Sequence, residues 1–77
     1  MKAYIEVKVE AGTNIHSLLN VMRAIEGVRE AFAVTGHTDI VASIEGSDLR
    51  SIADIITHRL HAIRGVASTE TMVCVEE

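Results

Sequence analysis

Cysteine and proline are nearly absent from this chain of 77 residues, which has one cysteine, Cys74, and no proline. A single cysteine cannot form an internal disulfide, and without a Cys-x-x-Cys pair the chain has no thiolate metal or redox site. The lack of proline and of low-complexity stretches argues against linkers and disordered tails. We therefore expect one ordered domain over residues 1–77.

Long apolar runs and positive charge are also scarce. No run approaches the roughly 20 residues of a membrane span, and charged residues near Met1 interrupt any signal-like segment. Seven Lys and Arg against eleven Asp and Glu give a net charge of −4. Because phosphate neutralisation supplies most non-specific affinity, this charge disfavours nucleic acid as a direct partner. We expect a soluble cytoplasmic protein that binds neither membrane nor nucleic acid.

The sequence does contain an internal repeat. Ile25-Glu26-Gly27-Val28 recurs as Ile63-Arg64-Gly65-Val66. Apolar positions upstream also correspond: Ile15 with Ala53, Leu18 with Ile56, and Met22 with Leu60. Each unit reads as strand, helix, glycine stop and strand. Two units predict a ferredoxin-like βαββαβ plait of the α+β class, with two helices on one face of a four-stranded antiparallel sheet.

Residue patterns place these elements along the chain. Strict alternation predicts a half-buried strand over 2–10, and helical spacing predicts one helix from Ile15 to the Gly27 stop and another from Leu49 to Gly65. The segments expected to cap these helices are Gly12-Thr13-Asn14 and Gly46-Ser47-Asp48. Further strands are expected over 28–35, 40–45 and 66–76.

The segment Val34-Thr35-Gly36-His37-Thr38-Asp39-Ile40-Val41 is typical of a β-hairpin tip. Gly36 can adopt a positive φ, and Thr38 and Asp39 carry oxygens that can hydrogen-bond the turn backbone. The tip lies at the centre of the chain and joins the two repeats.

Three of the four predicted strands carry apolar residues at both odd and even positions, and therefore on both faces of the sheet. Whichever parity meets the helices, apolar side chains remain on the opposite face, and monomers rarely expose an apolar patch on the order of a few hundred Å². We expect a second copy to pack its sheet there, with the charges of the first strand at the rim or paired across. The alternative is a monomer with ordinary surface hydrophobicity.

No arrangement of residues indicates catalysis or a metal. His58 and His61 are three residues apart on the second helix, but no third metal-binding residue matches them, so two solvated histidines are the simpler interpretation. No catalytic triad or phosphate-binding loop is evident. We expect no enzyme activity, cofactor or metal.

Small polar groups instead gather at the hairpin tip, in Gly36, Thr38 and Asp39, and on the last strand, in Thr69 and Thr71. Amide donors at a glycine turn suit a carboxylate, and a buried carboxylate such as Asp39 suits an ammonium group, so the set could hold a zwitterion. The alternative is structural, since Asp after a turn and Thr pairs on strands are common. His37 is either functional or a tolerated polar residue.

Three segments resemble a known family: Gly27-Val28-Arg29-Glu30-Ala31, the hairpin segment, and Gly65-Val66-Ala67-Ser68-Thr69-Glu70-Thr71. They are similar to the effector-binding (RAM) domain of Lrp/AsnC transcription regulators, and the similarity covers essentially the whole chain. It implies a dimeric α/β barrel, assembly into octamers or similar rings, and an amino acid bound near the hairpin tip. By resemblance the ligand-binding positions are Gly36, Asp39, Thr69 and Thr71, with His37 and Thr38 at variable tip positions.

The chain begins at the first strand of that domain, without the family's helix-turn-helix. We interpret it as a stand-alone form that senses an amino acid, or joins a DNA-binding Lrp/AsnC relative, and so modulates transcription or amino-acid metabolism indirectly. The alternatives are a dimeric α/β-barrel enzyme or enzyme subunit, which needs an acid–base or metal pair between its sheets, and an ACT-like amino-acid sensor, which pairs its sheets side by side.

Overall fold

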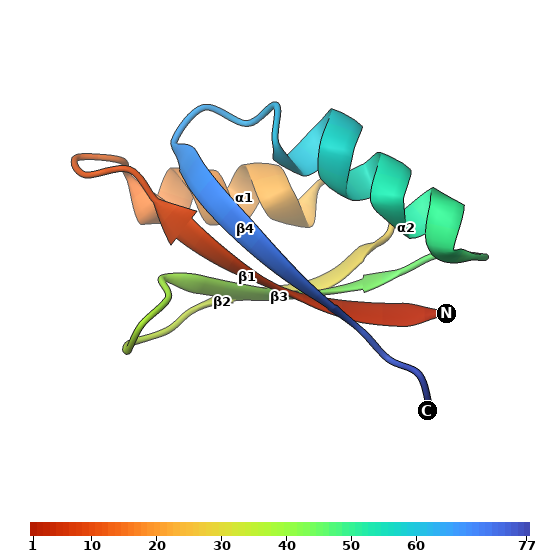
Figure 1. Ribbon diagram of the computed structural model, residues 1–77. Helices are drawn as coiled ribbons and strands as arrows, with labels where there is room; N and C mark the ends of the chain where they lie inside the picture. The colour runs from red at the N-terminus through yellow and green to blue at the C-terminus, as the bar shows by residue number, and fades with distance from the viewer.

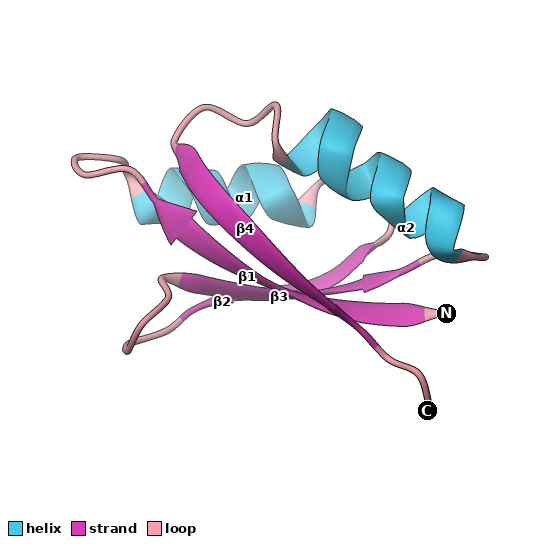
Figure 2. Ribbon diagram, in the orientation of Figure 1, coloured by secondary structure: helices cyan, strands magenta, loops and turns pink.

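Four antiparallel strands form one sheet, and the helices cover one of its faces (Figures 1 and 2). The computed structural model describes residues 1–77. Its elements are β1 (Lys2–Val9), α1 (Ile15–Arg23), β2 (Val28–Ala33), β3 (Ile40–Glu45), α2 (Leu49–Asp54), η1 (Ile55–Leu60) and β4 (Val66–Val73). The strand order is β2-β3-β1-β4. This order confirms the predicted ferredoxin-like plait. None of the helices is long and apolar enough to span a membrane.

The helix of each repeat is followed by the same turn. The Val28 N–H donates to the Ile25 carbonyl at 3.1 Å, and the Val66 N–H donates to the Ile63 carbonyl at 3.3 Å. The glycine between each pair has a φ of 98° or 103°, a conformation that other residues rarely adopt. These turns end the helices earlier than predicted, because the chain leaves helical geometry before it reaches the glycine.

Both helices begin at the segments predicted to cap them, and the caps are Asn14 and Asp48. The Asn14 side chain accepts a hydrogen bond from the Ser17 N–H at 3.0 Å, and the Asp48 side chain accepts one from the Ser51 N–H at 2.8 Å. Hydrogen bonds from Ser51 lower the pKa of the Asp48 carboxyl below its ordinary value. The second helix differs from the prediction because η1 is a π-helix, in which the His61 N–H donates to the Ile56 carbonyl at 3.0 Å.

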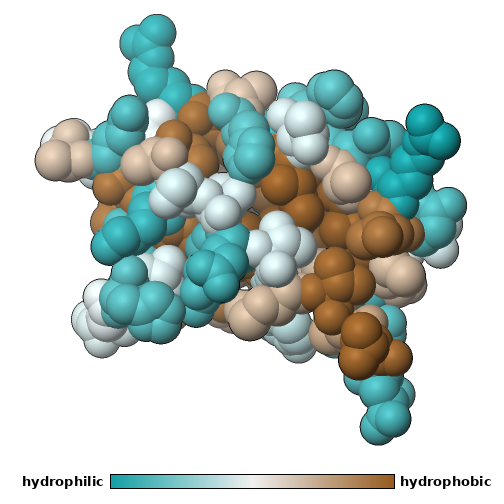
Figure 3. Space-filling model, viewed as in Figure 1, coloured by the Kyte–Doolittle hydropathy of each residue, from teal (hydrophilic) through white to brown (hydrophobic).

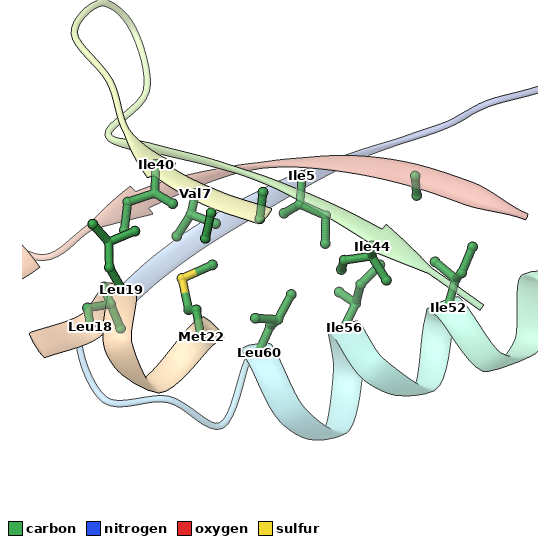
Figure 4. Close-up of a cluster of buried hydrophobic side chains, with 13 residues drawn as sticks. Ile5, Val7, Leu18, Leu19, Met22, Ile40, Ile44, Ile52, Ile56 and Leu60 are labelled. Atoms are coloured by element: carbon green, nitrogen blue, oxygen red, sulfur yellow. The ribbon is translucent and has the colours of Figure 1, made fainter. Parts of the chain in front are cut away.

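The core lies between the sheet and the helices. Figure 4 shows Ile5 and Val7 of β1 pointing toward Met22 and Leu60, which are equivalent positions of the repeat. The core consists of 13 buried apolar residues: Ala3, Ile5, Val7, Leu18, Leu19, Met22, Ala31, Ile40, Ala42, Ile44, Ile52, Ile56 and Leu60. Burial of Ala31 fixes the parity of β2 and turns Phe32 to the opposite face.

That opposite face, here called the open face, carries no helix. Its side chains, as the strand register places them, are Lys2, Tyr4, Glu6, Lys8, Glu30, Phe32, Val41, Ser43, Glu45, Ser68, Glu70 and Met72. Tyr4, Phe32 and Met72 remain 39%, 53% and 47% exposed. Apolar surface also runs across the side of the molecule shown in Figure 3, down to the C-terminal end.

The strand order places the charged residues of β1 in the middle of the open face. The two crossovers place β1 between β3 and β4, so Glu6 lies opposite Val41 on one side and opposite Glu70 on the other. Glu6 therefore lies on a central strand of the open face. The expectation that the charges of the first strand lie at the rim of a contact between copies, or pair across it, stays a prediction.

Candidate ligand site

The hairpin tip, residues 34–39, joins β2 to β3. The Val34 N–H donates to the Asp39 carbonyl at 2.9 Å and closes the loop. Gly36 has a φ of 125°, and a Cβ there would meet no atom within 4 Å. Glycine is therefore required at this position by backbone conformation and not by crowding.

Thr38 and Asp39 bind the tip to β1. The Thr38 hydroxyl donates to the Val7 carbonyl at 3.0 Å, and the Asp39 Oδ2 accepts from the Val9 N–H at 2.8 Å. The expectation that these side chains bond the turn backbone is wrong, because the end of β1 lies beside the start of β3 and offers the nearer partners. Asp39 thus has a structural hydrogen bond, while its Oδ1 accepts none from the protein.

A small polar cavity of about 160 Å³, here called the tip cavity, lies beside the hairpin tip. It has no apolar lining residue and is formed by Glu6, Lys8, His37, Thr38, Ser68, Thr69 and Glu70. The tip cavity therefore brings together three of the six predicted site residues, namely His37, Thr38 and Thr69. The other three predicted residues, Gly36, Asp39 and Thr71, do not line it.

Both signs of charge meet in the tip cavity. The Glu6 Oε2 lies 3.1 Å from the His37 Nε2, and Glu6 stands directly opposite Glu70 in the β1–β4 ladder. Like charges directly opposite each other destabilise a sheet, so a bound ammonium group would relieve this pair. Lys8 and His37 supply donors that suit a carboxylate.

Thr69 and Thr71 share one side of β4, as predicted. They stand opposite Val7 and Ile5, whose side chains point into the core, so both threonines lie on the helix side of the sheet. The Thr69 Oγ1 lies 2.6 Å from the Nε2 of His61, a residue expected to be solvated. Thr71 is exposed and has no side-chain hydrogen bond.

Sequence reasoning missed four residues of the tip cavity: Glu6, Lys8, Ser68 and Glu70. Alternation in the first strand had placed Glu6 and Lys8 on its polar side. Their partners on β4 could be found only from the strand order, which brings the first and last strands together. His58 and His61 join no group of three side chains able to hold a metal.

Comparisons with known proteins agree with this fold. Among curated proteins, two homocitrate synthases are similar: that of Sulfolobus acidocaldarius is 32% identical over 75 residues, and that of Sulfurisphaera tokodaii is 29% identical over 77 residues. The chain spans only 16% of the length of either relative.

Solved structures share the whole fold. TTHA0845 from Thermus thermophilus matches with a TM-score of 0.91 and 25% identity, over 99% of this chain and 94% of that one. AsnC of E. coli matches with a TM-score of 0.91 and 20% identity, over 99% of this chain and 51% of that one. The regulator NMB0573 from Neisseria meningitidis, solved with L-Met, gives 0.88 and 21% over 99% of this chain and 50% of that one.

A family model described as the Lrp/AsnC ligand binding domain matches residues 2–77. This match covers both repeats, the hairpin tip and every residue of the tip cavity. The chain belongs to the Lrp/AsnC ligand-binding domain family.

Proposed function

We propose that this chain is an amino-acid sensor that binds its effector at the tip cavity and acts through a partner, modulating transcription or amino-acid metabolism indirectly. The observation that carries the proposal is the mixed charge of the tip cavity, which sets Glu6 and Glu70 beside Lys8 and His37. A free α-amino acid carries one ammonium and one carboxylate group close together, so it complements both halves. Family membership supports a small-molecule ligand, and the L-Met complex of a structural neighbour supports an amino acid.

In this arrangement each end of the zwitterion has its own partners. The ammonium group binds between Glu6 and Glu70, where it offsets their mutual repulsion. The carboxylate binds toward Lys8 and the imidazole of His37. Gly36 and Asp39 then act as supports that hold the tip in place, as does Thr38, whose hydroxyl donates to the Val7 carbonyl. Thr69 borders the cavity, but its hydroxyl contacts His61 on the helix side.

The size of the tip cavity limits what one copy can hold. Ligand pockets usually measure about 300–1,000 Å³, whereas the tip cavity measures about 160 Å³. It accommodates the charged end of an amino acid but leaves a larger side chain projecting from the sheet. A neighbouring copy that covers this region would complete the pocket.

We propose that such a copy packs on the open face, giving a dimer that assembles further into an octamer or similar ring. The exposed Tyr4, Phe32 and Met72 supply the apolar area for this contact. The same surface would allow a mixed assembly with a DNA-binding Lrp/AsnC relative. Sheets that pair edge to edge would instead favour the ACT-like alternative.

Two observations bear on an enzymatic role. Similarity to about one sixth of two homocitrate synthases favours a second candidate function, a ligand-binding module within a larger enzyme. One observation favours catalysis by this domain itself, namely the contact between the Glu6 carboxylate and the His37 imidazole on the open face. Ser68, Thr38 and Thr69 line the same cavity, but none of their hydroxyl groups hydrogen-bonds His37, so the pair has no activated nucleophile. We therefore propose that the chain binds its ligand and does not transform it.

A thermal-shift screen of the twenty amino acids tests the proposal. A ligand at about 100 times its dissociation constant adds roughly 2.7 kcal/mol to the free energy of unfolding and raises the melting temperature. The amide and N-acetyl derivatives of the best ligand each lack one charge of the zwitterion and should stabilise far less. No stabilisation by any amino acid, or equal stabilisation by the derivatives, would contradict amino-acid sensing at a zwitterion site.

A further inference from the structure

A groove separates the two helices on the side of the molecule away from the open face. Helix α1 and the α2–η1 helix make only sparse contact with each other, although both pack on the sheet. Two cavities of about 470 and 460 Å³ lie along this gap and share Val21, Ile63 and Arg64. They form one continuous helix groove that is open to solvent.

The floor of the helix groove is apolar. Val21 of α1 is 50% exposed, and Ile25 and Ile63 of the two repeated turns are half-buried beside it. A β-branched side chain exposed to this extent in a groove is a ready contact for another apolar group. The floor therefore favours a partner with an apolar stripe.

The rim of the helix groove is cationic. His58, Arg59 and Arg64 are the titratable residues around the cavity of about 470 Å³, and no acidic residue lines it. Neither arginine has a carboxylate within ion-pair distance, although the chain as a whole carries a net charge of −4. Glu10 is the one acidic residue of the groove and lines the cavity of about 460 Å³. Glu26 and Asp54 line a neighbouring cavity, which they share with His58 and Arg59.

We propose that the helix groove docks an acidic amphipathic helix of a partner polypeptide. Helices that bind in grooves insert apolar side chains at i, i+3, i+4 and i+7, which suits the row formed by Val21, Ile25 and Ile63. Asp or Glu residues flanking that stripe pair with Arg59 and Arg64. This site lies on the helix side of the sheet, so it is separate from the tip cavity and from any copy on the open face.

The direct test uses a short designed helical peptide with a leucine stripe flanked by glutamates, labelled for fluorescence anisotropy. A matched peptide with lysine in place of every glutamate is the control for charge. The acidic peptide should bind at low salt, more weakly as salt is added, and the lysine peptide should not bind. Equal binding of both peptides, or no binding of the acidic one, would overturn the proposal.

Matched pairs of variants test whether the peptide binds in the helix groove. Arg64→Glu should weaken the acidic peptide about tenfold, whereas Arg50→Glu, the same change on an arginine outside the groove, should have little effect. Val21→Ser should weaken it similarly, whereas Leu49→Ser, at a residue 57% exposed outside the groove, should not. If the groove variants change the oligomeric state instead of peptide affinity, the groove is a contact between copies and the proposal fails. Amino-acid stabilisation should persist in all four variants, which separates this site from the proposed sensor site.

Discussion

At the scale of single residues, the most consequential contacts are those that bind the hairpin tip to β1. The Thr38 hydroxyl and the Asp39 carboxylate each bond the β1 backbone, at 3.0 and 2.8 Å. The same end of β1 supplies Lys8 to the tip cavity, so the tip and the charged groups are held as one unit. The position of His37 therefore depends on Thr38, which also lines the cavity, and on Asp39, which does not.

Replacement of Asp39 tests this anchoring role. Asp39→Ala removes the acceptor for the Val9 N–H and should lower the free energy of unfolding by about 1–3 kcal/mol. Asp39→Asn keeps a side-chain oxygen in the same place and should cost much less. Urea denaturation of both variants measures the difference, and an alanine variant as stable as wild type would show that the bond has no structural role.

Asp48 gives the chain a pH dependence of known sign. Its pKa is lowered in the folded protein from an ordinary 3.8, chiefly by hydrogen bonds from Ser51. A lowered folded pKa means that the ionised cap stabilises the fold above the unfolded pKa, and that this contribution is lost as pH falls through the folded pKa.

The neutral cap in Asp48→Asn should therefore leave a stability gap to wild type that is constant above about pH 5 and shrinks in more acidic solution. Melting curves of the two proteins across this range measure the gap. A gap that stays constant down to about pH 2 would contradict the assigned role of Asp48.

At the scale of elements, the repeat was enough to predict the order of strands and helices, both capping segments and the two glycine turns. Met22 and Leu60, paired by the repeat, are both fully buried. The π-helical geometry of η1 was not predictable, because its apolar spacing also fits an α-helix. Of the residues that line the tip cavity, His37, Thr38 and Thr69 were predicted and the other four were not. Glu70, for example, lies beside Glu6 only because the first and last strands of the chain pair with each other.

The glycine turns can be compared with the glycine of the hairpin tip. Gly65→Ala and Gly36→Ala both force alanine into a positive φ, at about 1–2 kcal/mol. At Gly65 the new Cβ would also lie 2.6 Å from the Thr13 Cγ2 and 3.1 Å from its Oγ1. Rotation of this β-branched side chain exchanges one close atom for another, so Gly65→Ala should cost at least about 1 kcal/mol more. Equal melting temperatures for the two variants would show that crowding by Thr13 is negligible.

At the scale of the whole molecule, the fold covers one face of the sheet and leaves the other bare. The open face combines exposed apolar residues with Glu6 and Glu70 at the tip cavity. Copies packed there would therefore link assembly to occupancy of the cavity, because an ammonium group offsets the acidic pair. The helix groove lies on the opposite side and remains free in such a dimer.

Sedimentation equilibrium tests the proposed dimer. Wild type should sediment as a dimer or a larger even-numbered assembly at micromolar concentration. Phe32→Asp puts a charge into the apolar contact and removes about 1.5–3 kcal/mol of burial per side chain, so it should dissociate the dimer. Leu49→Asp, at a residue of similar exposure on the helix side, is the matched control. A monomeric wild type would remove the open face as an interface.

The central claim is that the tip cavity binds a free amino acid by both of its charges, and calorimetric titration of the best ligand from the screen tests it most directly. Glu6→Gln and Lys8→Gln each remove one charge-assisted contact and should weaken binding by about 1.5–3 kcal/mol, or roughly 10- to 150-fold. Glu30→Gln, also on the open face but outside the tip cavity, should bind as wild type does. Unchanged affinity in both Glu6→Gln and Lys8→Gln would contradict the claim and place the amino acid elsewhere.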